Sequence, residues 1–255
     1  AATDGPDNLR ADDFPDWMGL QTNATNRSLR IQNLTDGDSV IDRASLLTIK
    51  FDTAYAKGSE ADAFVQKVLG HDWSAEPEMA DPVQHLRDWD YRLDISNRHA
   101  ALGTLTVLRH VTGQFTGDFG PAPDQAFREA VALLQKNYGR IDPEWGQVNR
   151  LVRGETDIPI SGGPDILRAI YPAELREDGK LHANAGDTWI ALVEWQADGT
   201  QSAEVIHQYG AATLDSSSPH YDDQAPLFAS EQWRPALLSR EQVEANAART
   251  YRPGR

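Results

Sequence analysis

The residues that could do chemistry in this sequence are scattered and match no common catalytic or metal-binding motif. Cysteine is absent, which excludes thiol nucleophiles, disulfide bonds and thiolate metal sites. No pair of histidines has the HxH, HxxxH or HExxH spacing that aims two ligands at one metal ion. We therefore expect surface or packed roles for the seven histidines, which are His71, His85, His99, His110, His182, His207 and His220.

Other catalytic arrangements are equally weak in the sequence. There is no GxSxG turn that would expose a serine nucleophile, no GxGxxG motif and no phosphate-binding loop. Ala1 cannot act as an N-terminal nucleophile, because that role requires a Ser, Thr or Cys side chain beside a free α-amino group. A glycosidase would need two carboxylates across a cleft, and the sequence cannot select two among its 39 acidic residues.

One local cluster combines an imidazole with carboxylates, in the run His220, Tyr221, Asp222, Asp223. This cluster could supply a general acid and a general base. The competing interpretation, which the sequence favours, is that Asp222 or Asp223 caps a helix or turn that begins near Gln224.

The composition is that of a globular protein, and we expect residues 1–255 to form a single structural unit. Hydrophobic residues make up 40% of the chain, enough for a substantial core. The 39 acidic and 24 basic residues give a formal net charge of −15, which would repel a phosphate backbone and argues against a nucleic-acid partner. No apolar run approaches the roughly 20 residues that span a bilayer, so no membrane span is expected.

Apolar residues recur at helical spacing through the first half of the chain. Trp89 lies on one of these apolar stripes and is expected in the core. The pattern predicts helices from Ser28 onward, around Leu46 to Phe51, over 61–69, from Pro82, over 100–111, and over 124–138 with Gly139 as the stop.

The second half has the pattern of strands. Residues 187–195, DTWIALVEW, carry apolar side chains at both alternating sets of positions, which predicts a strand buried on both faces or nearly so. Trp189 and Trp195 are therefore expected in the core. Gly199 should turn the chain into an antiparallel strand over 203–209, and a capping box at 239–242 should open a final helix. Helices followed by antiparallel strands predict an α+β fold.

Five stretches together resemble the penicillin acylase family of N-terminal nucleophile hydrolases, which includes penicillin acylases and acyl-homoserine-lactone acylases. The stretches follow the order expected for the C-terminal part of the β-subunit in that family. They are MGLQTNATNRSLRI (18–31), IKFDTAYAKGS (49–59), RGETDIPISGGPDILRA (153–169), GDTWIALVEW (186–195) and HQYGAATLDSSSPHYDDQAPLF (207–228).

This resemblance implies part of an αββα sandwich, in which two stacked antiparallel sheets lie between helical layers. It also implies a precursor that cleaves itself to free a β-subunit beginning with serine. In such enzymes the serine hydroxyl attacks an amide carbonyl, and backbone N–H groups and an Asn side chain hold the oxyanion. Both the serine and that Asn would lie outside this chain. The usual substrates are N-acyl compounds such as β-lactam antibiotics, acyl-homoserine lactones in quorum quenching, and acylated peptides.

The resemblance implies a catalytic role for Arg27, whose guanidinium would orient a carboxylate or the catalytic network. The alternative is that Arg27 pairs at the surface of a helix. Asn26 is a further candidate for lining the site, and Asn23 could be a displaced relative of the oxyanion residue. Some members bind structural calcium, for which Asp7 is the candidate ligand, although an Asp in a DGPDN loop is usually a turn residue. No other cofactor is expected.

The SPHYDDQ segment resembles a stretch that packs behind the active site. We expect His220, Tyr221, Asp223 and Gln224 to form a buried polar network with a structural role. The implied partners are the remainder of the β-subunit, the α-subunit of the same precursor and a small N-acyl substrate. The implied location is periplasmic or secreted.

Two other interpretations remain open in the sequence. One is a catalytically inactive acylase-like protein with a binding or structural role, and the other is a secreted carbohydrate-active domain. If the chain is part of a larger subunit, its terminal strands should expose an unpaired edge or a broad apolar face. Arg27 should then also lie beside a cleft.

Overall fold

The computed structural model describes residues 10–19, 25–37 and 40–252. The chain divides into two compact units, which we call the helical unit (Ala1–Val152 and Asp157–Gly186) and the hairpin unit (Arg153–Thr156 and Asp187–Arg255). Each unit is described by itself below. The assembly of both into a single structural unit stays a prediction.

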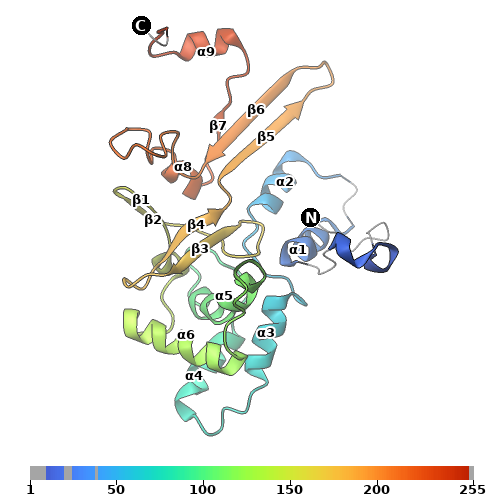
Figure 1. Ribbon diagram of the computed structural model, residues 1–255, viewed down its shortest axis with the longest axis vertical. Coiled ribbons are helices and arrows are strands. Elements are labelled where there is room, and N and C mark those ends of the chain that lie inside the picture. The colour runs from blue at the N-terminus through green and yellow to red at the C-terminus, as the bar shows by residue number, and fades with distance from the viewer. Residues whose placement is uncertain (1–9, 20–24, 38–39, 253–255) are drawn as a thin grey trace. The chain divides into compact units, whose positions relative to one another are not determined.

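The helices expected from the sequence are present in the helical unit (Figure 1). Three of them begin at side chains that accept a hydrogen bond from the backbone two or three residues into the helix: Thr25, Asp42 and Ser59. Gly139 ends the sixth helix in the left-handed conformation, as predicted, with φ of 66°. The elements are α1 (Asn26–Thr35), α2 (Arg43–Lys50), α3 (Glu60–Leu69), α4 (Ala80–Arg87), α5 (Ala100–Thr116), α6 (Pro123–Tyr138) and α7 (Trp145–Val148), with short 3-10 turns at Ala11–Asp13, Asp16–Met18 and Pro77–Met79.

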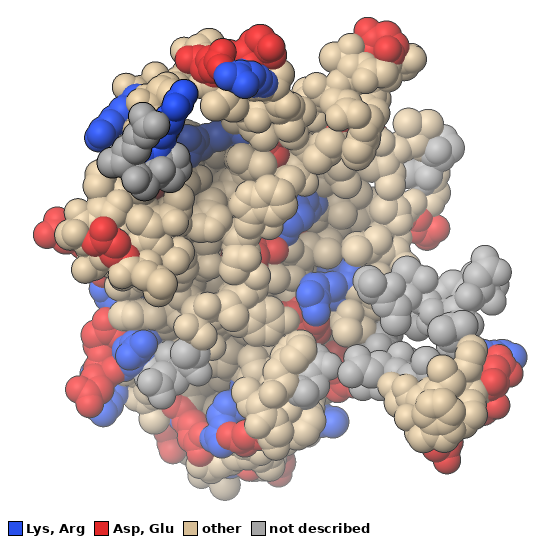
Figure 2. All heavy atoms as spheres, turned by 45° about the horizontal axis from the view of Figure 1, so that its top comes forward, with Lys and Arg blue, Asp and Glu red and all other residues tan. Residues whose placement is uncertain are grey.

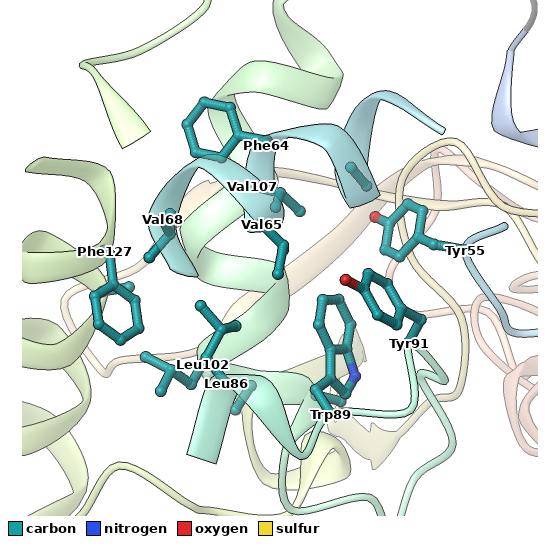
Figure 3. Close-up of a cluster of buried hydrophobic side chains, with 14 of the residues drawn as sticks. Tyr55, Phe64, Val65, Val68, Leu86, Trp89, Tyr91, Leu102, Val107 and Phe127 are labelled. Atoms are coloured by element: carbon teal, nitrogen blue, oxygen red, sulfur yellow. The ribbon is translucent and has the colours of Figure 1, made fainter. Parts of the chain in front are cut away.

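The core of the helical unit lies between α3, α4, α5 and α6 (Figure 3). Val65, Leu102 and Phe127 in this core are fully buried. Trp89 is buried as predicted and stacks on Tyr91 with ring centroids 4.8 Å apart. The close approach of this ring explains the glycine at position 103 in the first turn of α5, because a Cβ there would collide with the Trp89 ring.

A four-stranded sheet follows the helices, in the order β2-β1-β4-β3. Its inner pair β1·β4 is parallel, whereas β3·β4 is antiparallel, with a register shift at Tyr171/Pro172 where a proline interrupts the ladder. The strands are β1 (Asn149–Arg153), β2 (Thr156–Pro159), β3 (Ile170–Leu175) and β4 (Leu181–Gly186).

The hairpin unit contains a three-stranded antiparallel sheet in the order β5-β6-β7. The hairpin turns at Gly199, which has φ of 86°, and Ser239 and Gln242 form the predicted capping box. Helices and antiparallel strands in one chain confirm the α+β class. The elements are β5 (Trp189–Trp195), β6 (Gln201–His207), α8 (Ala225–Ala229), β7 (Arg234–Pro235) and α9 (Arg240–Asn246).

The predicted burial of β5 on both faces is wrong. Trp189 and Trp195 are 61% and 67% exposed, respectively. The apolar alternation did predict a strand, but burial also requires a second layer over the tryptophan face. Among the described residues no such layer covers it.

Figure 2 shows that acidic and basic side chains are scattered over the drawn face, with neutral atoms covering most of it. No helix among residues 10–19, 25–37 and 40–252 is long and apolar enough to cross a membrane.

Candidate functional site

A pocket of about 860 Å³ opens in the helical unit between α5, α6 and the β3·β4 pair. Its volume lies in the range of small-molecule sites, and its walls are mainly aliphatic and aromatic. Two of its aromatic residues, Phe115 and Phe119, are 63% and 54% exposed, which is unusual for side chains of this size. The apolar lining includes Phe64, Leu105, Leu108, Phe115, Phe119 and Leu133.

Most polar side chains of the pocket already have a hydrogen-bond or ion-pair partner within the protein. Arg109 donates to Asp118 through Nε at 3.2 Å and Nη2 at 2.6 Å. His110 lies 3.3 Å from a carboxylate oxygen of Glu60, and its ring packs on Phe64 with centroids 4.6 Å apart. Side chains that are paired in this way form part of the pocket walls and are less available to bind a ligand.

Arg27 lines the same pocket, and its side chain is 40% exposed. It lies in the first turn of α1, and its Nε is 3.6 Å from Oδ1 of Asp165. This separation is an ion pair but is longer than a hydrogen bond. The expectation that Arg27 lies beside a cleft is therefore confirmed, and its guanidinium is less firmly held than that of Arg109.

Asp165 is the acidic partner that organises the start of α1. One carboxylate oxygen accepts a hydrogen bond of 3.0 Å from the backbone N–H of Asn26, and so caps the positive end of the helix. The backbone N–H of Asp165 donates to the hydroxyl of Tyr171 at 3.0 Å. Asp165 itself has φ of 56°, in the left-handed region that few residues other than glycine adopt. Contacts from two separate elements, α1 and β3, hold the loop in this conformation.

Burial raises the pKa of the Asp165 carboxyl, because the charged form is costly away from water. The N–H of Asn26 and the guanidinium of Arg27 act in the opposite direction and only partly offset the burial. The second carboxylate oxygen, Oδ1, has no hydrogen-bond partner and is fully buried. Asp165 is thus a buried acid whose charge depends on its neighbours.

Tyr171 joins this acid to the pocket wall. Its ring lies edge-on to Phe115 with centroids 5.7 Å apart, while its hydroxyl accepts the hydrogen bond from Asp165. Tyr171 and Arg27 are thus two pocket-lining side chains that contact Asp165.

Asn26 is buried, with 2% exposure, and its amide is bonded to backbone on both sides. Its Nδ2 donates to the carbonyls of Asp165 at 2.8 Å and Ala54 at 3.2 Å. Its Oδ1 accepts from the N–H of Ala56 at 2.6 Å. Because these bonds occupy the amide, the geometry favours Asn26 as an anchor for α1. A catalytic role for it stays a prediction.

A second ion pair fixes α1 one turn further along. Arg30 donates to both carboxylate oxygens of Asp52, at 2.9 and 2.6 Å, and both side chains are largely buried. Arg30 does not line the pocket. The helix thus carries one tight internal ion pair and one looser pair at the pocket.

The predicted calcium ligand Asp7 and the candidate Asn23 lie outside the described residues. Within 10–19, 25–37 and 40–252, no group of three or more His, Asp or Glu side chains could hold a metal ion. The calcium prediction therefore stays untested.

The SPHYDDQ segment lies in the hairpin unit and is more exposed than predicted. His220 bonds Asp223 at 2.9 Å, but their side chains are 66% and 35% exposed, so the expectation of a buried network is wrong for this pair. Gln224 donates its backbone N–H to the carbonyl of Tyr209 at 2.7 Å. The bonds of this segment are structural, yet its place behind an active site stays a prediction.

The capping interpretation of the same segment is also wrong. Gln224 occupies the N-cap of α8 and no side chain caps that helix. The carboxylate of Asp222 accepts a hydrogen bond from the hydroxyl of Thr156 at 2.8 Å. The carboxylate of Asp223 is hydrogen-bonded to the ring of His220.

The sequence pattern missed the residue that organises this segment, Arg153. Its guanidinium stacks over the rings of Tyr221 and Tyr209, 4.1 and 4.6 Å from their centroids. It also donates to the carbonyl of Thr213 at 2.7 Å. Asp165 was missed in the same way: both residues lie in the stretch 153–169 that resembles the family, but nothing in that stretch shows which distant side chains they contact. In both cases the partners lie dozens of residues away in the sequence.

The sequence model of the penicillin amidase family matches residues 7–245. The chain belongs to this family. Similar curated proteins are two acyl-homoserine lactone acylases PvdQ from Pseudomonas fluorescens. That of strain Pf0-1 is 30% identical over 133 residues, and that of strain Pf-5 is 25% identical over the same length. In each case the match covers 49% of this chain and 17% of the relative.

Membership of the penicillin amidase family confirms the resemblance seen in the sequence. The matched region includes α1, the Asp165 loop, the pocket and the β5–β6 hairpin. The chain spans much less than the length of the curated relatives that it matches.

Proposed function

We propose that this chain is one part of an amide hydrolase that cleaves N-acyl compounds, with its serine nucleophile outside the chain. Membership of the penicillin amidase family and the similarity to two acyl-homoserine lactone acylases support an acylase. Among this chain's own residues, the main support for the proposal is the apolar pocket that Arg27 helps to line.

The pocket suits a substrate with an apolar body and a polar group near its reacting amide. Phe64, Leu108 and Leu133 offer a surface from which an acyl chain or an aromatic group would displace water. The guanidinium of Arg27 can donate two parallel hydrogen bonds to a carboxylate or carbonyl of the bound substrate. These side chains would bind and orient the substrate.

In the proposed reaction the hydroxyl of the external serine attacks the amide carbonyl, while the α-amine of the same residue takes its proton. The C–N bond breaks, the amine leaves with a proton, and an acyl-enzyme ester remains. Water then adds to the ester and releases the carboxylic acid and the serine. In this scheme Arg27 stabilises charge beside the reacting group, and Asp165 holds Arg27 in position.

The proposal extends to the remaining expectations of the family. The partners are the rest of the β-subunit and the α-subunit from one self-cleaving precursor, and the location is the periplasm or outside the cell. Calcium near Asp7 would have a structural role.

The test measures amide hydrolysis by the whole protein on acyl-homoserine lactones of several chain lengths and on a β-lactam amide. Arg27→Ala should lower kcat/KM about 10- to 100-fold, because the polar group of the substrate loses its partner. The matched control is Arg109→Ala, which removes another guanidinium of the same pocket. It should change kcat/KM by less than about threefold, because Arg109 is committed to Asp118.

Two results would contradict the proposal. Equal effects of the two substitutions would remove the special role of Arg27. Binding of N-acyl compounds without any hydrolysis by the intact wild-type protein would favour the alternative of an acylase-like binding protein.

A further inference from the structure

Strand β5 presents one regular row of backbone groups away from its partner β6. Gln208 donates to the carbonyl of Thr188, and at the other end Gln196 donates to the carbonyl of Thr200. Hydrogen bonding alternates along an antiparallel pair, so the even-numbered residues of β5 bond to β6. The N–H and C=O groups of Trp189, Ala191, Val193 and Trp195 therefore point to the other edge.

This other edge of β5 has no strand beside it among the described residues, because the sheet order is β5-β6-β7. β5 is seven residues long and contains no proline. Natural edges of this length are usually shortened, interrupted or covered, since unpaired backbone groups invite another strand.

The same odd-numbered residues form an apolar face. Trp189, Val193 and Trp195 are 61%, 39% and 67% exposed. The buried residue of this hairpin, Ile206, pairs with Ile190 and so belongs to the opposite face. Large exposed tryptophans in a row on a strand are typical of a surface that another element covers.

The hairpin unit has little core of its own to offset the exposure of that face. Its buried hydrophobic residues, within the part of the chain that the structure describes, are Ile206, Ala225 and Phe228. β7 is only two residues long, so this sheet is close to an isolated two-stranded hairpin, which is marginally stable by itself. The unit therefore requires further packing to reach the stability of an ordinary domain.

We propose that the outer edge of β5 receives a β-strand from another part of the same protein, outside this chain, whose apolar side chains lie beside Trp189 and Trp195. The curated relatives supply the argument for that occupant, because the match to this chain covers 17% of their length. A strand of the same protein also has a high effective concentration at the edge. The identity of the occupant rests on the proposed function, whereas the edge itself does not.

The test is hydrogen exchange of single backbone amides in the whole protein. The amides of Trp189, Ala191, Val193 and Trp195 should exchange at least about tenfold more slowly than that of the exposed turn residue Gly199. Amides of Ile190 and Leu192, which bond to β6, serve as the internal reference for a formed hairpin. Exchange of the odd-numbered amides as fast as Gly199, with Ile190 and Leu192 protected, would overturn the proposal.

A substitution tests the outward-pointing backbone groups of β5 without disturbing the hairpin. In Val193→Pro the lost N–H points to the outer edge, so pairing with β6 should persist. Protection should fall about tenfold or more at Ala191 and Trp195 but remain at Ile190 and Leu192. Unchanged protection of Ala191 and Trp195 in the variant would contradict strand addition.

Two further measurements separate this inference from other outcomes. If the protection depends on protein concentration and the mass in solution is that of a dimer, the occupant is a second copy and the proposal is wrong. Amide hydrolysis is assayed on the same samples. Protected odd-numbered amides in a protein without hydrolytic activity would support strand addition and contradict the proposed function. Unprotected odd-numbered amides in a protein that hydrolyses amides would contradict strand addition and support the proposed function.

Discussion

The two ion pairs of helix α1 differ in a way that separates a structural contact from a candidate functional one. Arg30 and Asp52 form two hydrogen bonds and are largely buried, whereas Arg27 and Asp165 are 3.6 Å apart and Arg27 is 40% exposed at the pocket. Both pairs join the same helix to the same unit, and they lie one turn apart. The difference indicates that a loosely held cation remains available to a ligand, while a tightly held one is used in folding.

The strongest test of this contrast is Asp52→Ala. The substitution leaves the guanidinium of Arg30 without its carboxylate in a largely buried setting. We expect a loss of about 3–4 kcal/mol in the free energy of unfolding, measured by urea denaturation. A loss below about 1 kcal/mol would mean that the Arg30–Asp52 pair is not the structural one.

The next largest effect is expected for Asn26→Ala. It removes three side-chain hydrogen bonds and leaves the carbonyls of Asp165 and Ala54 and the N–H of Ala56 without that partner. Loss of a buried amide of this kind should cost about 2–3 kcal/mol. Asn26→Asp provides the comparison, since it keeps the acceptor but not the donor. A loss in Asn26→Asp well below that in Asn26→Ala would argue against the donor bonds as the main contribution, because the introduced carboxylate cannot donate to the two carbonyls.

The smallest effect on stability should come from Asp165→Asn, which should instead reduce activity. At neutral pH the free energy of unfolding should change by about 1 kcal/mol or less, because burial already opposes the ionised form. Asparagine can still accept the hydrogen bond from Asn26, but it cannot hold Arg27 by charge. We therefore expect kcat/KM to fall toward that of Arg27→Ala. Unchanged kcat/KM would remove Asp165 as a positioning residue.

The pH dependence of stability gives the same acid a second test. The folded-state pKa of Asp165 is raised, so the folded protein holds this proton more tightly than the unfolded chain. Its contribution to stability is fully present below the unfolded pKa of about 3.9 and is lost as the pH rises through the folded pKa. Relative to the wild type, Asp165→Asn should lose less stability between acidic and neutral pH. A wild-type curve that parallels the variant would contradict the shift.

Much of the helical unit could be predicted from the sequence. The spacing of apolar residues identified the helices from 61–69 through 124–138, and Gly139 marked the end of α6. Trp89 was correctly placed in the core, but the helical stripe that suggested it is wrong there, because α4 ends at Arg87 and Trp89 lies beyond it. Local capping also worked at Ser239, whose partners lie within three residues.

The sequence failed where burial or pairing depended on distant segments. Trp189 and Trp195 have the same apolar character as Trp89 but are exposed, because a strand pattern does not show which layer will cover it. Asp165 was not singled out in the sequence, although its carboxylate caps a helix 139 residues earlier in the chain. Arg153 begins a stretch that resembles the family, but its role was not visible, since its two tyrosine partners lie far along the chain.

By itself the sequence determined the α+β class, the helix boundaries to within a few residues, the family, and Arg27 as the residue to look for. These follow from short-range spacing and from the order of several distinctive stretches. Tertiary structure alone decided that Arg27 lines an apolar pocket, that Asp165 is its partner, and that β5 offers an unpaired edge. The first two are meetings of segments distant in the chain, and the third is the lack of such a meeting among the described residues; both are set by the packing of each unit.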